Sequence, residues 1–178
     1  MAIHIIIDGY NLIGSEKGLT GNLEAQRDSL VRQLQRYQES KGYPITVVFD
    51  GWRSGWRHEV EERSGGITII FSQLGEKADS VIQRLAREMG SGCVVVTSDR
   101  EVRSAAEASG AVAIYAGEFS AKLRDLELKG TGFQGLRDQG LEEFVDEGMK
   151  GLRDKEKRGN PRRLSKRERK RRGKLKKL

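Results

Sequence analysis

The sequence lacks the features that define several large classes of protein. It contains a single cysteine, Cys93, which excludes an intramolecular disulfide framework and a zinc site built from several cysteines. No apolar run approaches the roughly 20 residues that a membrane-spanning helix needs. The first eight residues have no basic segment and are too short for the hydrophobic part of a signal peptide. We therefore expect a cytoplasmic protein without a membrane segment.

Motifs of common enzyme classes are also missing. The sequence has no Walker motif, and no serine elbow accompanies His4 or His58, as a Ser-His-Asp hydrolase would require. The spacing Gly130-x-Gly132-x-x-Gly135 matches a dinucleotide fingerprint, but it follows a charged helical segment instead of a strand. We expect no nucleotide cofactor.

Charge is distributed unevenly along the 178 residues. Residues 150–178 hold 16 Lys and Arg side chains against three acids, a net charge of +13, and residues 1–149 have a net charge of −6. The basic tail predicts a polyanionic partner, for which nucleic acid is the leading candidate. Its charge exceeds what solubility requires. A solvated tail without a binding site is the alternative.

The order of apolar segments predicts an α/β domain. Short runs rich in β-branched residues are expected to form about five strands of a mainly parallel sheet, at residues 3–7, 45–49, 67–71, 94–97 and 111–115. Helical patterns are expected around residues 23–37, 78–89, 102–106 and 118–129. Alternating strands and helices are typical of βαβ units, with helices on both faces of the sheet in a three-layer α/β/α arrangement.

We divide the chain into three parts. The folded domain is expected to span residues 1–128. Residues 129–152 form a glycine-containing connection with a short helix candidate around 141–149. Residues 153–178 are a basic tail with few apolar anchors, which we expect to be disordered or to become helical on binding.

Aspartates fall at the ends of the predicted strands. Asp8, Asp50 and Asp99 each follow an apolar strand directly or within three residues. Asp79 lies in the first turn of a predicted helix, on the shoulder of its buried face. Because ligand sites of open parallel sheets lie beyond the carboxyl ends of the strands, we expect these four acids to share one crevice.

Such a set of acids predicts metal-dependent chemistry. Close carboxylates repel unless a cation compensates them. Hard oxygen ligands suit Mg²⁺ or Mn²⁺, which activate water and stabilise phosphoryl transition states. The residues thus indicate a metal-dependent phosphodiester hydrolase. Taken alone, each aspartate is more typical of a turn or a helix start than of a functional site, so the prediction depends on the four together. For Asp99, the Ser98-x-x-Glu101 pattern predicts that Ser98 caps the following helix instead.

Weaker candidates surround the predicted crevice. Asn11 could orient Asp8, hold a metal-bound water or only cap the local turn. Lys77, Arg100 and Arg103 could hold a phosphate, or could be solvated helix residues. Aromatic side chains among cations suit stacking on single-stranded bases, although one tryptophan could simply pin the loop. The loop after Asp50 contains such a set: Trp52, Arg53, Trp56, Arg57 and His58.

Four segments together resemble the YacP-like branch of the NYN domain proteins, within the PIN-like nuclease group. They are Asp8-Gly-Tyr-Asn11, Phe49-Asp50-Gly51, Lys77-Ala-Asp79-Ser-Val-Ile82 and Thr97-Ser-Asp99-Arg100. The resemblance covers roughly residues 1–160. It implies an Mg²⁺- or Mn²⁺-dependent endoribonuclease with Asp8, Asp79 and Asp99 as metal ligands, and further catalytic positions at Asp50 and Asn11. It also implies cleavage of mRNA in association with ribosomes.

The basic extension after Arg153 is not assigned to the family core by this resemblance. It suits a tether to RNA or to the ribosome, because each neutralised phosphate adds affinity without regard to sequence. The tail cations expected to contact RNA are Arg162, Arg163, Lys166, Arg167, Arg169, Lys170, Arg171 and Arg172.

Two other functions remain open on the sequence. The chain could be a non-catalytic RNA- or ribosome-binding protein with a PIN-like scaffold. A small-molecule phosphatase is disfavoured, because Asp8-Gly-Tyr lacks the second acid, two residues on, that haloacid-type phosphatases use.

Overall fold

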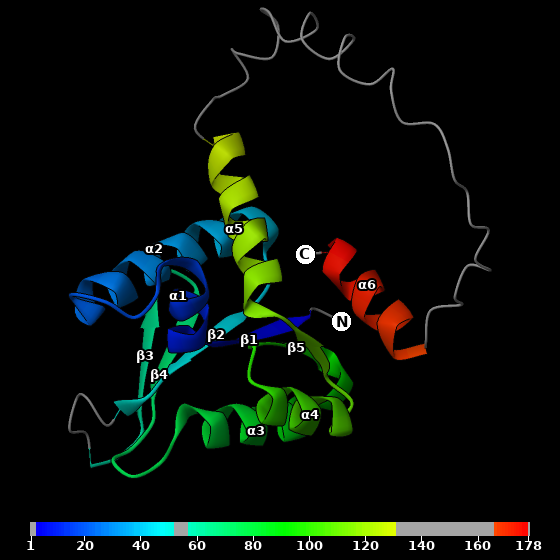
Figure 1. The fold of residues 1–178 in the computed structure, drawn as a ribbon, viewed down its shortest axis with the longest axis horizontal. Coiled ribbons are helices and arrows are strands. Elements are labelled where there is room, and N and C mark those ends of the chain that lie inside the picture. The colour runs from blue at the N-terminus through cyan, green and yellow to red at the C-terminus, as the bar shows by residue number, and fades with distance from the viewer. Residues whose placement is uncertain (1–2, 52–56, 131–165, 178) are drawn as a thin grey trace, which may run out of the picture.

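The computed structural model describes residues 3–51, 57–130 and 166–177, which form a six-stranded sheet and six helices (Figure 1). The strands are β1 (His4–Asp8), β2 (Ile45–Phe49), β3 (Val60–Ser64), β4 (Ile67–Phe71), β5 (Cys93–Val96) and β6 (Val112–Ile114). The helices are α1 (Gly9–Lys17), α2 (Leu23–Lys41), α3 (Ala78–Met89), α4 (Arg100–Ala108), α5 (Ala116–Gly130) and α6 (Lys166–Lys177). A 3₁₀ turn (Gly90–Gly92) precedes β5.

The strand order creates a switch point in the middle of the sheet. The order is β3-β4-β2-β1-β5-β6, and every pairing is parallel except that of β3 with β4. The chain runs outward from β1 through β2 to β4, then returns to place β5 on the other side of β1. The carboxyl ends of β1 and β5 therefore flank the position where open α/β sheets bind their ligands.

Helices cover both faces of the sheet. α1, α2 and α5 pack together over one face, and α3 and α4 pack together over the other (Figure 1). Successive residues of a strand face opposite sides, so Ile5 and Ile7 enter the first core and Ile6 the second. In the first core Tyr37 and Phe119 meet edge to face, with ring centroids 5.3 Å apart. The predicted three-layer α/β/α architecture is confirmed.

The five predicted strands and four predicted helices are present, and the sequence missed two elements. β3 has the sequence Val60-Glu-Glu-Arg-Ser64, whose three charged residues are exposed because the strand lies at the edge of the sheet. The sheet therefore has six strands instead of about five. α1 was missed because it begins with Gly9, contains Gly14 and has the adjacent residues Leu12 and Ile13 as its buried apolar side chains, instead of residues at helical spacing.

Part of the predicted basic tail is helical and lies against the body. α6 runs beside the edge strand β6 (Figure 1). Leu175 packs against the first core. The Nζ groups of Lys170 and Lys174 donate to the carbonyls of Gly110 (3.0 Å) and Ser91 (2.8 Å). The predicted short helix around 141–149 falls outside the described residues.

Candidate active site

Asp8 lies at the switch point, at the junction of β1 and α1. Its side chain is only 8% exposed. One carboxylate oxygen accepts the backbone N–H of Asn11 (3.2 Å) and so caps α1. The other accepts the hydroxyl of Thr97 on the adjacent β5 segment (3.2 Å). The carboxylate is therefore held from both sides of the crevice.

Thr97 and Asn11 join the ends of β1 and β5. The Thr97 hydroxyl oxygen also accepts the backbone N–H of Asp99 (3.1 Å). The Asn11 side-chain oxygen accepts the backbone N–H of Ser98 (2.8 Å). Asn11 thus fixes the segment that presents Asp99. Sequence analysis assigned no role to Thr97; its position between a buried strand and an aspartate is the signal that could have pointed to it.

Asp99 caps the helix that follows β5. One of its oxygens accepts the backbone N–H groups of Glu101 (2.8 Å) and Val102 (3.0 Å). Capping by Ser98, predicted from the Ser-x-x-Glu pattern, is wrong, because α4 begins at Arg100 and the N-cap is therefore one residue later. The second oxygen of Asp99 accepts no hydrogen bond from the described residues.

Asp50 connects the end of β2 to the start of α3. Its Oδ1 accepts the backbone N–H of Ala78 (2.6 Å), whereas the N-cap residue Lys77 makes no side-chain cap. This bond holds the first turn of α3, where the half-buried Asp79 follows Ala78. Asp50 therefore positions the backbone that presents Asp79.

The glycines after Asp8 and Asp50 are required by close packing. A Cβ added to Gly9 would lie 2.2 Å from the Phe49 ring, and one added to Gly51 would lie 1.7 Å from the carbonyl oxygen of Ser72. The Ser72 hydroxyl accepts the N–H of Gly51 (3.0 Å). Both strand ends are thus built for close approach of neighbouring segments.

The four carboxylates influence one another electrostatically. Burial, together with the negative charges of Asp79 and Asp50, raises the pKa of Asp8 to about 6, although the hydrogen bonds from Asn11 and Thr97 act to lower it. Burial, followed by the charges of Asp99 and Asp50, also raises the pKa of Asp79, while Lys77 lowers it. The repulsion puts Asp79 and Asp50 within electrostatic range of Asp8, and Asp99 within range of Asp79. That the four acids share one crevice stays a prediction.

The donor set fits a hard divalent cation. Carboxylate oxygens are the ligands that Mg²⁺ and Mn²⁺ prefer, and a cation between these acids would remove their repulsion. Within residues 3–51, 57–130 and 166–177, no three acidic, histidine or cysteine side chains form a group that could hold a metal ion in this conformation. The catalytic and metal-binding roles of these residues stay predictions.

The predicted RNA-binding residues of the body lie at different places. Lys77 and Arg100 are exposed at the starts of α3 and α4, next to the crevice. The Arg103 guanidinium lies 3.6 Å from the centroid of the Tyr115 ring. Arg57 is exposed in the loop before β3. Trp52 and Arg53 fall outside the described residues.

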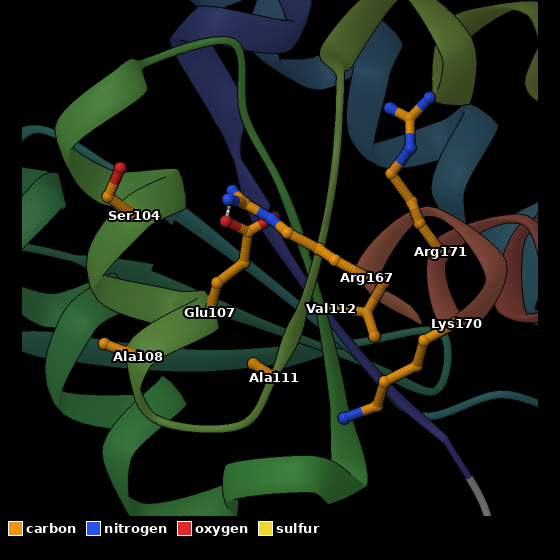
Figure 2. A pocket seen from close by; sticks show the side chains of 8 residues that line it. All are labelled: Ser104, Glu107, Ala108, Ala111, Val112, Arg167, Lys170 and Arg171. Carbon is orange, nitrogen blue, oxygen red and sulfur yellow. Dashed lines mark ion pairs between the residues drawn. The ribbon is translucent and has the colours of Figure 1, made fainter. Parts of the chain in front are cut away.

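Several tail cations contact the body. Arg167 pairs with Glu107, and Arg171 forms a two-point bond with Glu118 (2.9 and 3.0 Å). Between α4, β6 and α6 lies a cavity of about 570 Å³, whose lining includes Ser104, Glu107 and the cations Arg167, Lys170 and Arg171 (Figure 2).

Arg169 and Arg172 are exposed on α6, and Lys166 is its first residue. Arg162 and Arg163 fall outside the described residues. No helix of the described part of the chain has the length and apolar character needed to cross a membrane.

Comparison with known proteins places this geometry in a family. The sequence model of the YacP-like NYN domain matches residues 5–175. The matched residues include most of α6. The basic extension therefore belongs to the family domain, whereas sequence analysis did not assign it to the family core. No curated protein matches the chain.

Two solved structures are similar to this one. The crystal structure of Rae1 (YacP) from Bacillus subtilis has 28% sequence identity and a TM-score of 0.60, over 74% of this chain and 78% of that chain. Its W164L mutant has 26% identity and a TM-score of 0.60, over 71% of this chain and 78% of that chain.

Proposed function

Because this chain belongs to the YacP-like NYN domain family, we propose that it is a metal-dependent endoribonuclease that hydrolyses RNA phosphodiester bonds. The observation on which the proposal depends is the group of mutually repelling carboxylates at the switch point of the sheet. A protein gains nothing in stability from burying like charges together. A bound cation and a catalytic role explain their position.

Each residue has a distinct part in this proposal. Asp8, Asp79 and Asp99 would hold Mg²⁺ or Mn²⁺, since they approach from β1, α3 and the start of α4. When bound, such an ion supplies Lewis acidity that activates water and offsets charge on the phosphoryl oxygens. Asn11 and Thr97 keep the ends of β1 and β5 in register through their hydrogen bonds. Asp50 positions Asp79 through the start of α3.

We further propose that the substrate is mRNA in a ribosome-associated context. The net charge of +13 in residues 150–178 supports a polyanionic partner for the tail. On α6, Arg169 and Arg172 are exposed while the opposite side of the helix contacts the body. This arrangement leaves cations available for RNA while α6 stays packed.

The proposal is tested by cleavage of end-labelled RNA, both naked and on translating ribosomes. Reactions with Mg²⁺ or Mn²⁺ are compared with reactions in EDTA. The control is the Asp8→Asn/Asp99→Asn double variant, purified identically, because asparagine keeps an oxygen that can cap α1 and α4. We expect metal-dependent products that the double variant does not form. Equal products from both proteins would indicate a contaminating nuclease.

A second function is favoured by a specific observation. Asp8, Asp50 and Asp99 each accept a backbone N–H at the start of a helix, which is a structural role in itself. The chain could then be an RNA- or ribosome-binding scaffold without catalysis. In that case neither substrate is cut, and the double variant binds RNA as the unmodified protein does.

A further inference from the structure

Tyr115 stands at the same end of the sheet as the four acids. It follows β6, whose Ile114 pairs with Val96, and the Ile114 carbonyl accepts the N–H of Thr97 (3.1 Å). Asp8, Thr97 and Tyr115 thus lie on three adjacent strands. Since neighbouring strands are about 4.8 Å apart, the backbones of Asp8 and Tyr115 are about 10 Å apart. The Tyr115 side chain is 43% exposed, unlike the buried strand residues before it.

Arg103 links this ring to the acids. Its backbone N–H bonds to the carbonyl of Asp99 (3.1 Å), so it lies one helical turn beyond that residue on the same side of α4. Its guanidinium lies 3.6 Å from the Tyr115 ring centroid. Its Nε is buried and makes no hydrogen bond with the described residues. The guanidinium is therefore held against the ring, which places its positive charge beside an exposed aromatic face.

A cation of the basic tail completes the group. The Arg171 guanidinium lies 5.5 Å from the Tyr115 ring centroid. Glu118 fixes both residues, since its carboxylate accepts two bonds from Arg171 and the backbone N–H of Tyr115 (3.2 Å). Packing of α6 therefore brings a second guanidinium group close to the Tyr115 ring.

We propose that Tyr115, Arg103 and Arg171 form a nucleotide-binding subsite for the single-stranded RNA next to the bond that is cleaved. An exposed ring with neighbouring guanidinium groups suits a stacked base and its phosphate. The body has a net charge of −6 over residues 1–149, so a strand that reaches the acids needs cations close beside them. This inference rests on the proposed function, and it gives α6 a second role as part of the substrate site.

The subsite is tested by binding, without catalysis. A short fluorescein-labelled single-stranded oligoribonucleotide is titrated with the full chain in EDTA, and anisotropy is measured. We expect Tyr115→Ala to weaken binding about tenfold, since base–aromatic stacking accounts for a change of that order. Tyr115→Phe keeps the ring and stays within about twofold of the unmodified protein. Arg63→Ala is the matched control, because Arg63 is an exposed cation on β3, at the opposite edge of the sheet.

The second measurement separates this inference from the proposed function. In the cleavage assay we expect Tyr115→Ala to raise KM about tenfold with kcat little changed. Thermal unfolding of each variant shows that the fold is intact. Unchanged binding by Tyr115→Ala, or equal losses in Tyr115→Ala and Arg63→Ala, would overturn the subsite, as would failure of the unmodified chain to bind the oligonucleotide. Binding that depends on Tyr115 without any metal-dependent cleavage would uphold the subsite and refute the nuclease.

Discussion

Replacing Asp8 with asparagine should stabilise the protein at neutral and higher pH. The side chain is 8% exposed, and burial and the neighbouring acids raise its pKa from the ordinary 3.8 to about 6. Above pH 6 the folded protein must hold this carboxylate ionised against those costs. Asparagine is uncharged at every pH, so the variant avoids them.

The size of the effect follows from the pKa. A change from 3.8 to about 6 corresponds to about 3 kcal/mol in the free energy of unfolding. Asparagine keeps an oxygen for the N–H of Asn11, but its amide group disturbs the bond that Thr97 donates. The loss of that hydrogen bond costs about 1 kcal/mol, so the expected net gain is about 2 kcal/mol at pH 8.

The sign of the pH dependence is also fixed. Between pH 3.8 and about 6 the folded state keeps the Asp8 proton and the unfolded state loses it, so stability falls as pH rises through this window. Below pH 3.8 both states are protonated and the penalty is absent. The stability of Asp8→Asn relative to the unmodified protein should therefore increase between about pH 4 and pH 7 and then stay constant.

Urea unfolding followed by circular dichroism measures this difference in EDTA at several pH values. Asp125→Asn, which removes an exposed carboxylate on α5, is the matched control and should show no such trend. Adding Mn²⁺ at pH 8 should stabilise the unmodified protein, by about 2.7 kcal/mol at a hundred times its Kd, and should stabilise Asp8→Asn less. A difference between the two proteins that is the same at pH 4.5 and pH 8 would refute the reasoning.

Three further predictions concern single contacts. Asp99→Asn should abolish cleavage and keep the α4 cap, whereas Asp99→Ala should also lower stability by about 1 kcal/mol in urea unfolding; equal stability of the two variants would contradict the capping role. Gly51→Ala should cost about 3 kcal/mol in the same assay, because its Cβ meets the Ser72 carbonyl; a loss below about 0.5 kcal/mol would show that the loop can move. Glu118→Gln should raise the rate of amide hydrogen exchange in α6 about fivefold at low salt, because it weakens the bond with Arg171. In 1 M NaCl the difference between the two proteins should disappear. An unchanged exchange rate at low salt would mean that other contacts hold α6.

The sequence was sufficient to predict the buried strands and the helices whose apolar residues recur at regular spacing. The buried strands are runs rich in β-branched residues. Asp8 is the last residue of β1 and Asp50 directly follows β2, so their placement at strand ends required no knowledge of the tertiary fold. Asp79 was placed by the helical periodicity of α3, which buries Ala78, Val81, Ile82 and Ala86. The local sequence pattern was enough here because the need to bury one face of a strand or helix sets the spacing of its apolar residues.

The contacts between elements could not be predicted in this way. The bond from Thr97 to Asp8 joins residues 89 positions apart, and it exists because β5 returns to pair with β1. The bond from Arg171 to Glu118 depends on where α6 packs, over a separation of 53 positions. Sequence analysis did not predict β3, because this solvated edge strand contains no apolar run.

The two edge strands of the sheet, β3 and β6, are protected from self-association in different ways. An open strand presents unpaired backbone groups to which a second chain can add. At one end β3 presents the charged side chains of Glu61, Glu62 and Arg63, and at the other the apolar strand β6 is accompanied by α6. The edge strand β6 has no charged side chains of its own to prevent pairing with a strand of another chain. The basic helix α6 therefore protects β6 from such pairing.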